Sequence, residues 1–394
     1  MTDLFITGGR TLLDGDLVET SLQVEDGRIA AVGGERHHGI GLDARDLLVL
    51  PGIIDLHGDA FERQLMPRPG VDFPVDVALI DSDKQAVANG ITTVFHGTTW
   101  SWEPGLRGAE NARHLLGAIE TLRPQLAADT RFHLRQETYT LDAEAEITRW
   151  LADGRIDLLA FNDHMDLTGI TKPAKRARMV ERSGLSSAEF DQLVERVMSR
   201  ADAVPASIAR LAQAANAAGV PTLSHDDMTP AMRTVFRDLG VNIAEFPINE
   251  ETAMAAAAAG DFIVFGAPNV VRGGSHTGWT RASDMIAKGL CSILASDYYY
   301  PAQLLAAFRL VNDRILPLPD AWALISSAPA RAAGLADRGE LAAGRRADIV
   351  LVDDSVALRP RIKAVIANGR LVHLADAGRL HPGLTVPRQA IAAA

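Results

Sequence analysis

One histidine and one carboxylate lie two residues apart near the N-terminus, directly after a strand-like stretch. His57 and Asp59 follow the apolar run 47–54. In an extended strand, side chains at positions i and i+2 point to the same face, so this imidazole and this carboxylate can reach one metal ion. Taken alone, the stretch is explained equally well as a buried strand that leaves through a polar loop. The metal hypothesis therefore depends on further ligands elsewhere in the chain.

Further candidate ligands follow later strand-like segments in the same way. A lone histidine at a strand end is more often structural than a ligand, but repeated placement at strand ends favours a site. The single cysteine, Cys291, excludes a cysteine-cluster site, which leaves histidines and carboxylates. Such nitrogen and oxygen donors suit zinc, manganese or iron. The residues that we expect to bind metal are His57, Asp59, Glu137, His164, His225 and Asp297.

Two of these residues have chemical roles beyond holding an ion. Glu137 can bridge two metals about 3.5 to 4 Å apart, which would share and activate one water. Asp297 follows the last strand and is the expected catalytic residue, either as a ligand, as the acceptor of the proton from that water, or as both. The expected cofactor is therefore one or two divalent metal ions, zinc first, with manganese and iron as alternatives.

Basic and glycine-rich segments close to these positions indicate an anion site. In the segment RGGSHTG, residues 272–278, clustered glycines allow a close backbone approach to a ligand, and backbone N–H groups beside an arginine can hold phosphate. For KPAKRAR, residues 172–178, a solvated helix face is as good an explanation as phosphate binding. From the loops after candidate ligands we expect Arg63, Arg68 and Lys172 to contact substrate.

In the part of the chain that must position these residues, strand-like apolar runs alternate with alanine-rich helical stretches. One long helix is predicted over residues 187–217. Eight such units in residues 51–335 predict an α/β fold, a (β/α)8 TIM-like barrel, for which about 250 residues is typical. A doubly wound open sheet is the alternative. In a barrel, chemistry collects at the carboxyl ends of the strands. The predicted strands are 49–56, 92–98, 131–138, 156–162, 221–224, 242–246, 262–266 and 291–296.

Both ends of the chain consist of short strand-like runs separated by turn residues. Residues 1–50 and 336–394 share this style, and Asn368-Gly369 is a strong two-residue hairpin signal. The simplest arrangement pairs the two ends into one small β-sandwich domain. The barrel of residues 51–335 is then inserted between the two halves of that domain.

Composition limits the partners of the protein. The formal net charge of -11 disfavours nucleic acid and anionic membranes, because the long-range field repels both. No charged leader with an apolar core opens the sequence, and no apolar run reaches the roughly 18 residues that a membrane span requires. We therefore expect a cytoplasmic protein with no nucleic-acid or membrane partner, and a homo-oligomer is compatible with the sequence.

Five blocks of the sequence resemble the amidohydrolase superfamily and, within it, the PhnM family of phosphonate metabolism proteins. The resemblance implies a metal-dependent hydrolase whose small phosphorylated substrate is α-D-ribose 1-methylphosphonate 5-triphosphate, with the 5-phosphate and pyrophosphate as products. It also implies that Arg272, Ser275 and His276 contact phosphate. The blocks, in chain order, are PGIIDLHGDAFERQLMPRPGV, LSHDDMTP, EFPINEETA, PNVVRGGSHTG and LASDYYYPAQLL.

The sequence departs from the superfamily pattern at three positions. Asp59 stands where a second histidine is common, Glu137 would replace a metal-binding lysine, and Asn249 follows strand six where a histidine is usual. The loop DHMDLTGITKPAKR also lacks the Pro-Gly-Gln run that is usual in the PhnM pattern, which bears on the substrate. Two other functions remain open at this point: hydrolysis of an amide or cyclic amide, and a non-catalytic subunit that binds a phosphorylated ligand.

Overall fold

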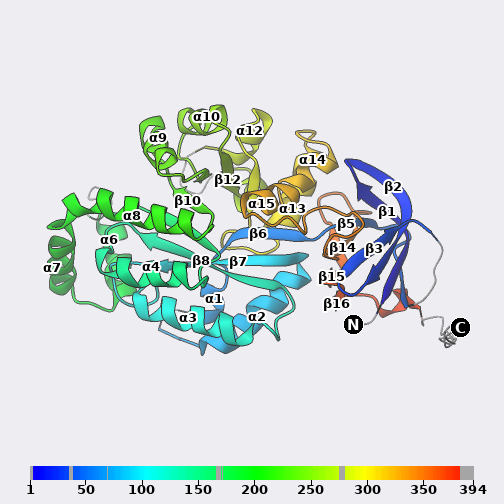
Figure 1. Ribbon diagram of the computed structural model, residues 1–394, viewed down its shortest axis with the longest axis horizontal. Helices are drawn as coiled ribbons and strands as arrows, with labels where there is room; N and C mark the ends of the chain where they lie inside the picture. Colours follow the sequence, from blue (N-terminus) through cyan, green and yellow to red (C-terminus); the bar gives the residue numbers. More distant parts are fainter. Residues whose placement is uncertain are drawn as a thin grey trace, which may run out of the picture.

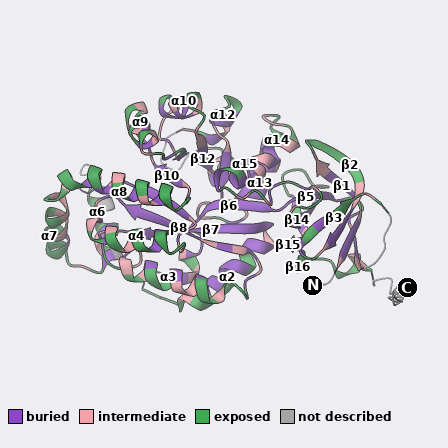
Figure 2. Ribbon diagram, in the orientation of Figure 1, coloured by how far each residue is buried: buried purple, intermediate pink, exposed green. Residues whose placement is uncertain are grey.

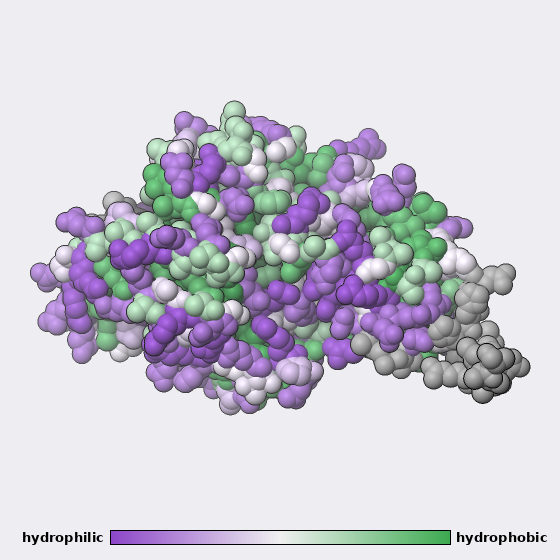
Figure 3. Space-filling model, viewed as in Figure 1, coloured by the Kyte–Doolittle hydropathy of each residue, from purple (hydrophilic) through white to green (hydrophobic). Residues whose placement is uncertain are grey.

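The structure is a computed structural model that describes residues 3–34, 39–68, 70–165, 170, 172–274 and 280–381. It contains a barrel surrounded by helices and, beside it, a separate sheet that holds both ends of the chain (Figure 1). None of the helices in these ranges is long and apolar enough to cross a membrane. Hydrophilic residues are widespread over the outer helices on the face seen in Figure 3.

Eight parallel strands form the barrel, and each overlaps one of the predicted strands, so the predicted (β/α)8 fold is confirmed. Neighbours in sequence are neighbours in the sheet, from the first strand to the last. The strands are buried, whereas the outward faces of the helices are exposed (Figure 2). The strands are β6 (Ile53–Gly58), β7 (Ile91–Trp100), β8 (Asp129–Glu137), β9 (Leu158–Asn162), β10 (Thr222–His225), β11 (Ile243–Glu245), β12 (Phe262–Gly266) and β13 (Ile293–Ala295).

The first predicted strand, 49–56, is two strands. Residues Leu48–Pro51 form β5 of the small sheet, and the barrel begins with β6 after a break at Gly52. A Cβ atom at Gly52 would lie 2.2 Å from Oγ1 of Thr92, so only glycine fits where the chain passes between the two sheets. The indole N–H of Trp322 donates to the carbonyl of Pro51 at 3.0 Å and holds this crossing.

The barrel closes between β6 and β13 by two different means. At the mouth, the N–H of Asp297 donates to the carbonyl of His57 at 2.9 Å, and that of Asp59 donates to the carbonyl of Asp297 at 3.1 Å. Deeper in the barrel, the side-chain amide of Gln303 donates to the carbonyls of Ile54 and Leu294, at 3.2 and 2.8 Å. This closure places the predicted ligands of the first and last strands next to each other.

The helices follow the predicted pattern with one exception. The long helix predicted over 187–217 is two helices, α7 and α8, separated by a 3-10 turn at Ala201–Ala203. Pro205 lies in the first turn of α8, where its missing N–H is tolerated and where it could not continue an earlier helix. The helices are α1 (Glu62–Leu65), α2 (Val75–Ala88), α3 (Ala109–Leu122), α4 (Glu144–Ala152), α6 (Pro173–Ser183), α7 (Ser187–Met198), α8 (Val204–Ala217), α9 (Pro230–Asp238), α10 (Glu250–Ala258), α11 (Ala267–Arg272), α12 (Ala282–Ala287), α13 (Ala302–Asn312), α14 (Leu318–Ala323) and α15 (Ser327–Ala332).

The small sheet combines strands from both ends of the chain, as predicted. Its main path runs β16-β15-β14-β5-β1-β2-β3, with β4 paired to β1 and β17 paired to β4. The predicted turn Asn368-Gly369 joins β15 to β16, and both residues have positive φ, 50° and 71°. The exact domain limits at residues 50 and 336 stay a prediction. The strands are β1 (Leu4–Leu13), β2 (Asp16–Glu25), β3 (Arg28–Val32), β4 (Ile40–Asp43), β5 (Leu48–Pro51), β14 (Ile349–Asp353), β15 (Arg361–Ala367), β16 (Arg370–Leu374) and β17 (Leu380–His381).

Candidate active site

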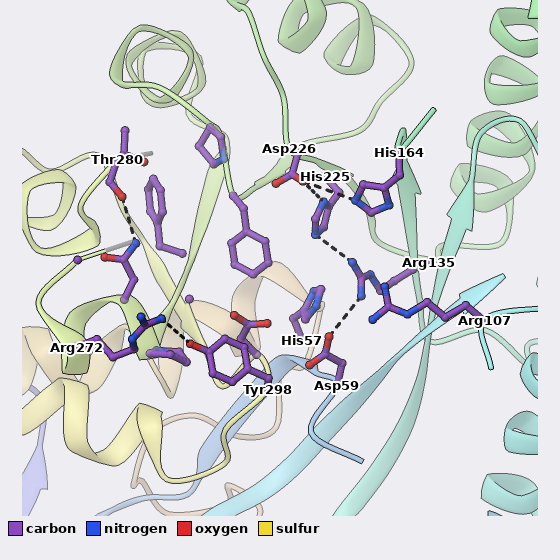
Figure 4. A pocket seen from close by; sticks show the side chains of 18 residues that line it. His57, Asp59, Arg107, Arg135, His164, His225, Asp226, Arg272, Thr280 and Tyr298 are labelled. Carbon is purple, nitrogen blue, oxygen red and sulfur yellow. Dashed lines mark hydrogen bonds and ion pairs between the residues drawn. The ribbon is translucent and has the colours of Figure 1, made fainter. Parts of the chain in front are cut away.

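A cavity of about 260 Å³ lies at the carboxyl ends of the barrel strands (Figure 4). Five of the six residues predicted to bind metal line it, each from the end of a strand or from the residues that follow: His57, Asp59, His164, His225 and Asp297. The sixth, Glu137, lines a neighbouring cavity that shares His164 and Arg107 with the first. The strand-end pattern in the sequence therefore converges in space.

The donor atoms form three overlapping groups. In each group one nitrogen or oxygen atom per residue lies within 4.8 Å of the others. Imidazole and carboxylate donors at this spacing fit a divalent ion such as zinc, manganese or iron. The groups are His57 with His225 and Glu245, His164 with His225 and Asp226, and His57 with Asp59 and Asp297.

Glu245 is one residue of the site that the sequence analysis missed. Its Oε1 atom lies 2.7 Å from Nδ1 of His57, and both side chains are buried. Burial opposes ionisation of Glu245, but the charge and hydrogen bond of His57 lower its pKa to about 2. From the sequence, Asn249 was the polar residue noted after the sixth barrel strand, β11. In the structure, Asn249 caps α10, because its side-chain oxygen accepts from the N–H of Thr252 at 2.8 Å. Glu245 itself is the last residue of β11, so the rule that a polar residue ends each strand could have found it.

Glu137 contacts His164. Its Oε1 atom is 2.6 Å from Nδ1 of His164, and its Oε2 accepts from the N–H of the same residue at 3.2 Å. On the other side of the ring, Nε2 of His164 is 3.7 Å from Asp226. Burial opposes the charged imidazole, but the two carboxylates raise the pKa of His164 to about 9. Glu137 thus orients the imidazole in this structure, and a bridging role stays a prediction.

Three residues at the barrel mouth adopt the left-handed backbone region that side chains other than glycine seldom occupy. Asp226, Phe246 and Asp297 have φ values of 60°, 54° and 55°. Asp226 directly follows β10 and Phe246 directly follows β11. Asp297 is the second residue after β13. Such strain costs on the order of 1 to 3 kcal/mol and persists where the surrounding structure fixes the backbone, often at functional sites. Here it turns the chain sharply so that Asp226 and Asp297 line the cavity.

Asp297 is paired with a second carboxylate in the same donor group. Burial raises the pKa of Asp297 to about 7, and the nearby charge of Asp59 adds to this increase. A carboxyl group with this pKa is suited to accept or release a proton near neutral pH. The geometry is therefore consistent with both roles predicted for Asp297.

Arginines make part of the same cavity positive, and two of them were not predicted. Arg107 pairs through two hydrogen bonds of 3.1 and 2.9 Å with Glu62. Arg135 projects from β8 toward Asp59 and His225 (Figure 4). Arg272, which was predicted, donates to the Tyr298 hydroxyl at 3.3 Å. Arg135 lies inside a strand, and Arg107 lies in a loop that does not directly follow a predicted ligand, so the sequence analysis did not select them.

The other residues predicted to contact substrate do not line this cavity. Arg63 is exposed and donates to the backbone carbonyl of Tyr298. Arg68 forms an isolated β-bridge with Val71. Lys172 is exposed and directly precedes α6. The segment KPAKRAR enters α6, and its Arg178 lines the neighbouring cavity together with Glu137 and His164, so both explanations of the segment stay open. Ser275 and His276 lie outside the described residues.

Comparison of sequences identifies relatives along most of the chain. A family profile described as "Amidohydrolase family" matches residues 84–373. The chain is 35% identical over 363 residues to the α-D-ribose 1-methylphosphonate 5-triphosphate diphosphatase of Escherichia coli strain K12, which covers 88% of this chain and 94% of that protein. It is 26% identical to the adenine deaminase of Methylobacterium nodulans, over 94% of this chain but 58% of the deaminase.

Comparison of structures supports the fold. The dihydropyrimidinase from Brevibacillus agri NCHU1002 superimposes with a TM-score of 0.63 at 12% identity, over 94% of this chain and 95% of that one. At this identity the likeness concerns the fold alone, while the family profile spans more than half of the sequence. The chain therefore belongs to the amidohydrolase family.

Proposed function

We propose that this protein hydrolyses a ribosyl 5-triphosphate, converting α-D-ribose 1-methylphosphonate 5-triphosphate to the 5-phosphate and pyrophosphate in phosphonate catabolism. The observation that carries the proposal is that grouped metal donors and three arginines line one cavity. Cations suit a polyphosphate, whose transition state places charge on the phosphoryl oxygens. The particular substrate comes from the 35% identical relative of Escherichia coli. A cytoplasmic location belongs to the same proposal.

The residues that would hold the metal are those of the three donor groups. We assign His57, Asp59, His225, Glu245 and Asp297 as the central candidates and His164 with Asp226 as the outer ones. Zinc is the first expectation, with manganese or iron as alternatives. A bound divalent ion polarises phosphoryl oxygens and acidifies water.

The protein residues supply positioning and proton transfer. Asp297 accepts the proton of the attacking water, for which a pKa of about 7 is suited. Hydrolysis breaks the anhydride bond between the first and second phosphates, and pyrophosphate leaves. Arg135 and Arg272 offset the negative charge of the phosphates, since guanidinium groups form paired hydrogen bonds with phosphate oxygens.

Phosphorus NMR of the metal-loaded protein with this triphosphate tests the proposal. We expect the substrate signals to be replaced by equal amounts of the 5-phosphate and pyrophosphate. Protein treated with a chelator is the matched control and should show no turnover until a divalent metal is restored. If protein with bound metal leaves the triphosphate intact, the proposed reaction is wrong.

The same preparation separates the proposal from its alternatives. The 26% identity to adenine deaminase makes adenine a suitable test for carbon–nitrogen bond hydrolysis, read out as ammonia release. A cyclic amide such as dihydrouracil tests the amide alternative. Ammonia or ring opening without pyrophosphate release would favour these functions. Bound phosphorylated ligand without any turnover, in protein lacking metal, would favour a non-catalytic subunit.

A further inference from the structure

Arg135 places a buried positive charge among the candidate metal donors. Its side chain is 5% exposed, although it lines the cavity. One end of the guanidinium, Nη1, lies 3.6 Å from Oδ2 of Asp59, and the other, Nη2, donates to Nε2 of His225 at 3.2 Å (Figure 4). The side-chain oxygen of Asn162 accepts from Nε and Nη2 at 3.2 Å in the amide orientation that satisfies both residues. The guanidinium is therefore fixed in direction.

Among the described residues, Arg135 differs from its neighbour Arg107 in having no hydrogen bond to a carboxylate. Arg107 makes two charge-assisted hydrogen bonds with Glu62, whereas the Asp59 contact of Arg135 is longer than a hydrogen bond. Its closest partners are Nε2 of His225 and the side-chain oxygen of Asn162, neither of which belongs to a carboxylate. Carboxylates accompany the buried charge of Arg135 at longer range, because it forms an ion pair with Asp59 and, against the effect of burial, acts to lower the pKa values of Glu137 and Asp297. A phosphate oxygen in the cavity would add a charge-assisted hydrogen bond that these carboxylates do not make.

The same guanidinium competes with a second metal ion. Asp59 and His225 belong to different donor groups, and His225 is shared by two of the three. Arg135 contacts both residues, and its Nη2 atom donates to Nε2 of His225, so His225 can bind an ion through Nε2 only if this hydrogen bond breaks. An arginine carries a permanent positive charge, and like charges a few ångströms apart in a buried site repel strongly. Filling several donor groups with dications would therefore require Arg135 to move.

We infer that Arg135 supplies the second positive charge of the site, so that the chain binds one divalent ion and the Arg135 guanidinium binds phosphoanhydride oxygens. The planar fork of arginine suits two oxygens of one phosphate group. The anhydride part of this inference rests on the proposed function. The stoichiometry of metal binding rests only on the arrangement of Arg135, Asp59 and His225.

Metal analysis tests the first part. Wild-type protein saturated with zinc and freed of excess ion should hold one equivalent per chain. In Arg135→Gln, a second equivalent should bind, or the affinity for the first should rise by about tenfold or more, because the repulsion is gone. Arg272→Gln removes the same charge from the same cavity without touching a donor residue, so its zinc binding should equal that of wild type. Two equivalents in wild type, or unchanged zinc binding in Arg135→Gln, would overturn the inference.

Titration of the zinc-loaded protein with inorganic pyrophosphate tests the second part. Arg135→Gln should bind pyrophosphate about 10 to 100-fold more weakly, the usual worth of a charge-assisted hydrogen-bonded pair. Arg135→Lys keeps the charge but not the fork, so it should hold one zinc and bind pyrophosphate with intermediate affinity. It also provides the measurement if Arg135→Gln fails to fold. Wild-type pyrophosphate affinity in a folded Arg135 variant would refute anion binding by this residue.

These readouts are independent of the proposed reaction. If the wild-type protein cleaves no triphosphate, the proposed function is wrong, yet zinc stoichiometry and pyrophosphate affinity still decide the role of Arg135.

Discussion

Nδ1 of His57 lies 2.7 Å from Oε1 of Glu245, and this contact joins the first and sixth strands at the centre of the barrel mouth. When the Nδ1–H group of a neutral His57 donates a hydrogen bond to the carboxylate, the Nε2 lone pair is left to bind a metal. Glu245 would therefore act on the site both as a donor and through the orientation of His57.

Glu245→Gln should weaken metal binding. The amide keeps the shape of the side chain but loses the charge that orients His57. Replacing a residue that orients a metal-binding histidine typically lowers the metal affinity about 10 to 100-fold. Zinc titration against a competing chelator measures this. Asn249→Ala, which removes a helix cap and a hydrogen bond to the Met228 carbonyl but no candidate ligand, is the control and should bind zinc as wild type does. Equal zinc affinity in Glu245→Gln would show that His57 needs no such partner.

His225→Ala and Asp297→Asn should abolish turnover while the fold stays intact. His225 belongs to two donor groups, and Asp297 combines a donor role with proton transfer. Loss of a proton acceptor alone typically costs about 10² to 10⁴ in rate. Steady-state kinetics with circular dichroism as the folding check separates catalysis from stability. A wild-type rate in either folded variant would refute the assigned site.

Gln303→Leu should destabilise the protein. Gln303 is fully buried, and its amide donates to carbonyls on both sides of the β6–β13 closure. The substitution leaves two buried acceptors without this donor, at a cost of about 1 to 3 kcal/mol for each. Urea unfolding measures the change in the free energy of unfolding. Gln213→Leu, at an exposed position of α8, is the control and should stay within about 0.5 kcal/mol of wild type.

Asp353 should make stability depend on pH in the acid range. Hydrogen bonds from Ser355, opposed by burial and aided by Arg361, lower its pKa from 3.8 to about 2. A carboxyl group whose pKa is lower in the folded state stabilises the protein at pH values above its pKa in the unfolded state. This contribution to the free energy of unfolding is lost as the pH falls from about 4 to about 2. Asp353→Asn should therefore be less stable than wild type near neutral pH, by up to about 2 kcal/mol.

The measurement for Asp353 is urea unfolding of both proteins across the acid range. The gap between wild type and Asp353→Asn should narrow as the pH falls toward 2. A gap that is constant from neutral pH to about pH 2 would mean that the folded protein does not lower this pKa.

Much of the site could be predicted from the sequence because it rests on local patterns. Each parallel strand is a short apolar run, and the polar residue that ends it must lie at one mouth of the barrel. His57, His164, His225 and Asp297 were found in this way and line one cavity. The Asn368-Gly369 turn was equally local, since a two-residue hairpin requires positive φ at both positions.

Only the tertiary structure decided which other residues join them. Arg135 lies within its strand, and Glu245 lay inside the predicted strand 242–246 although it ends the observed one. Whether such a residue faces the cavity depends on strand register and on the tilt of the strands in the barrel. The basic residues Arg63, Arg68 and Lys172 lie in or beside loops after ligand strands, yet they do not line the cavity, because the course of a loop is set by contacts distant in sequence. The sequence thus determined which strand ends carry chemistry, and long-range packing determined which charges accompany it.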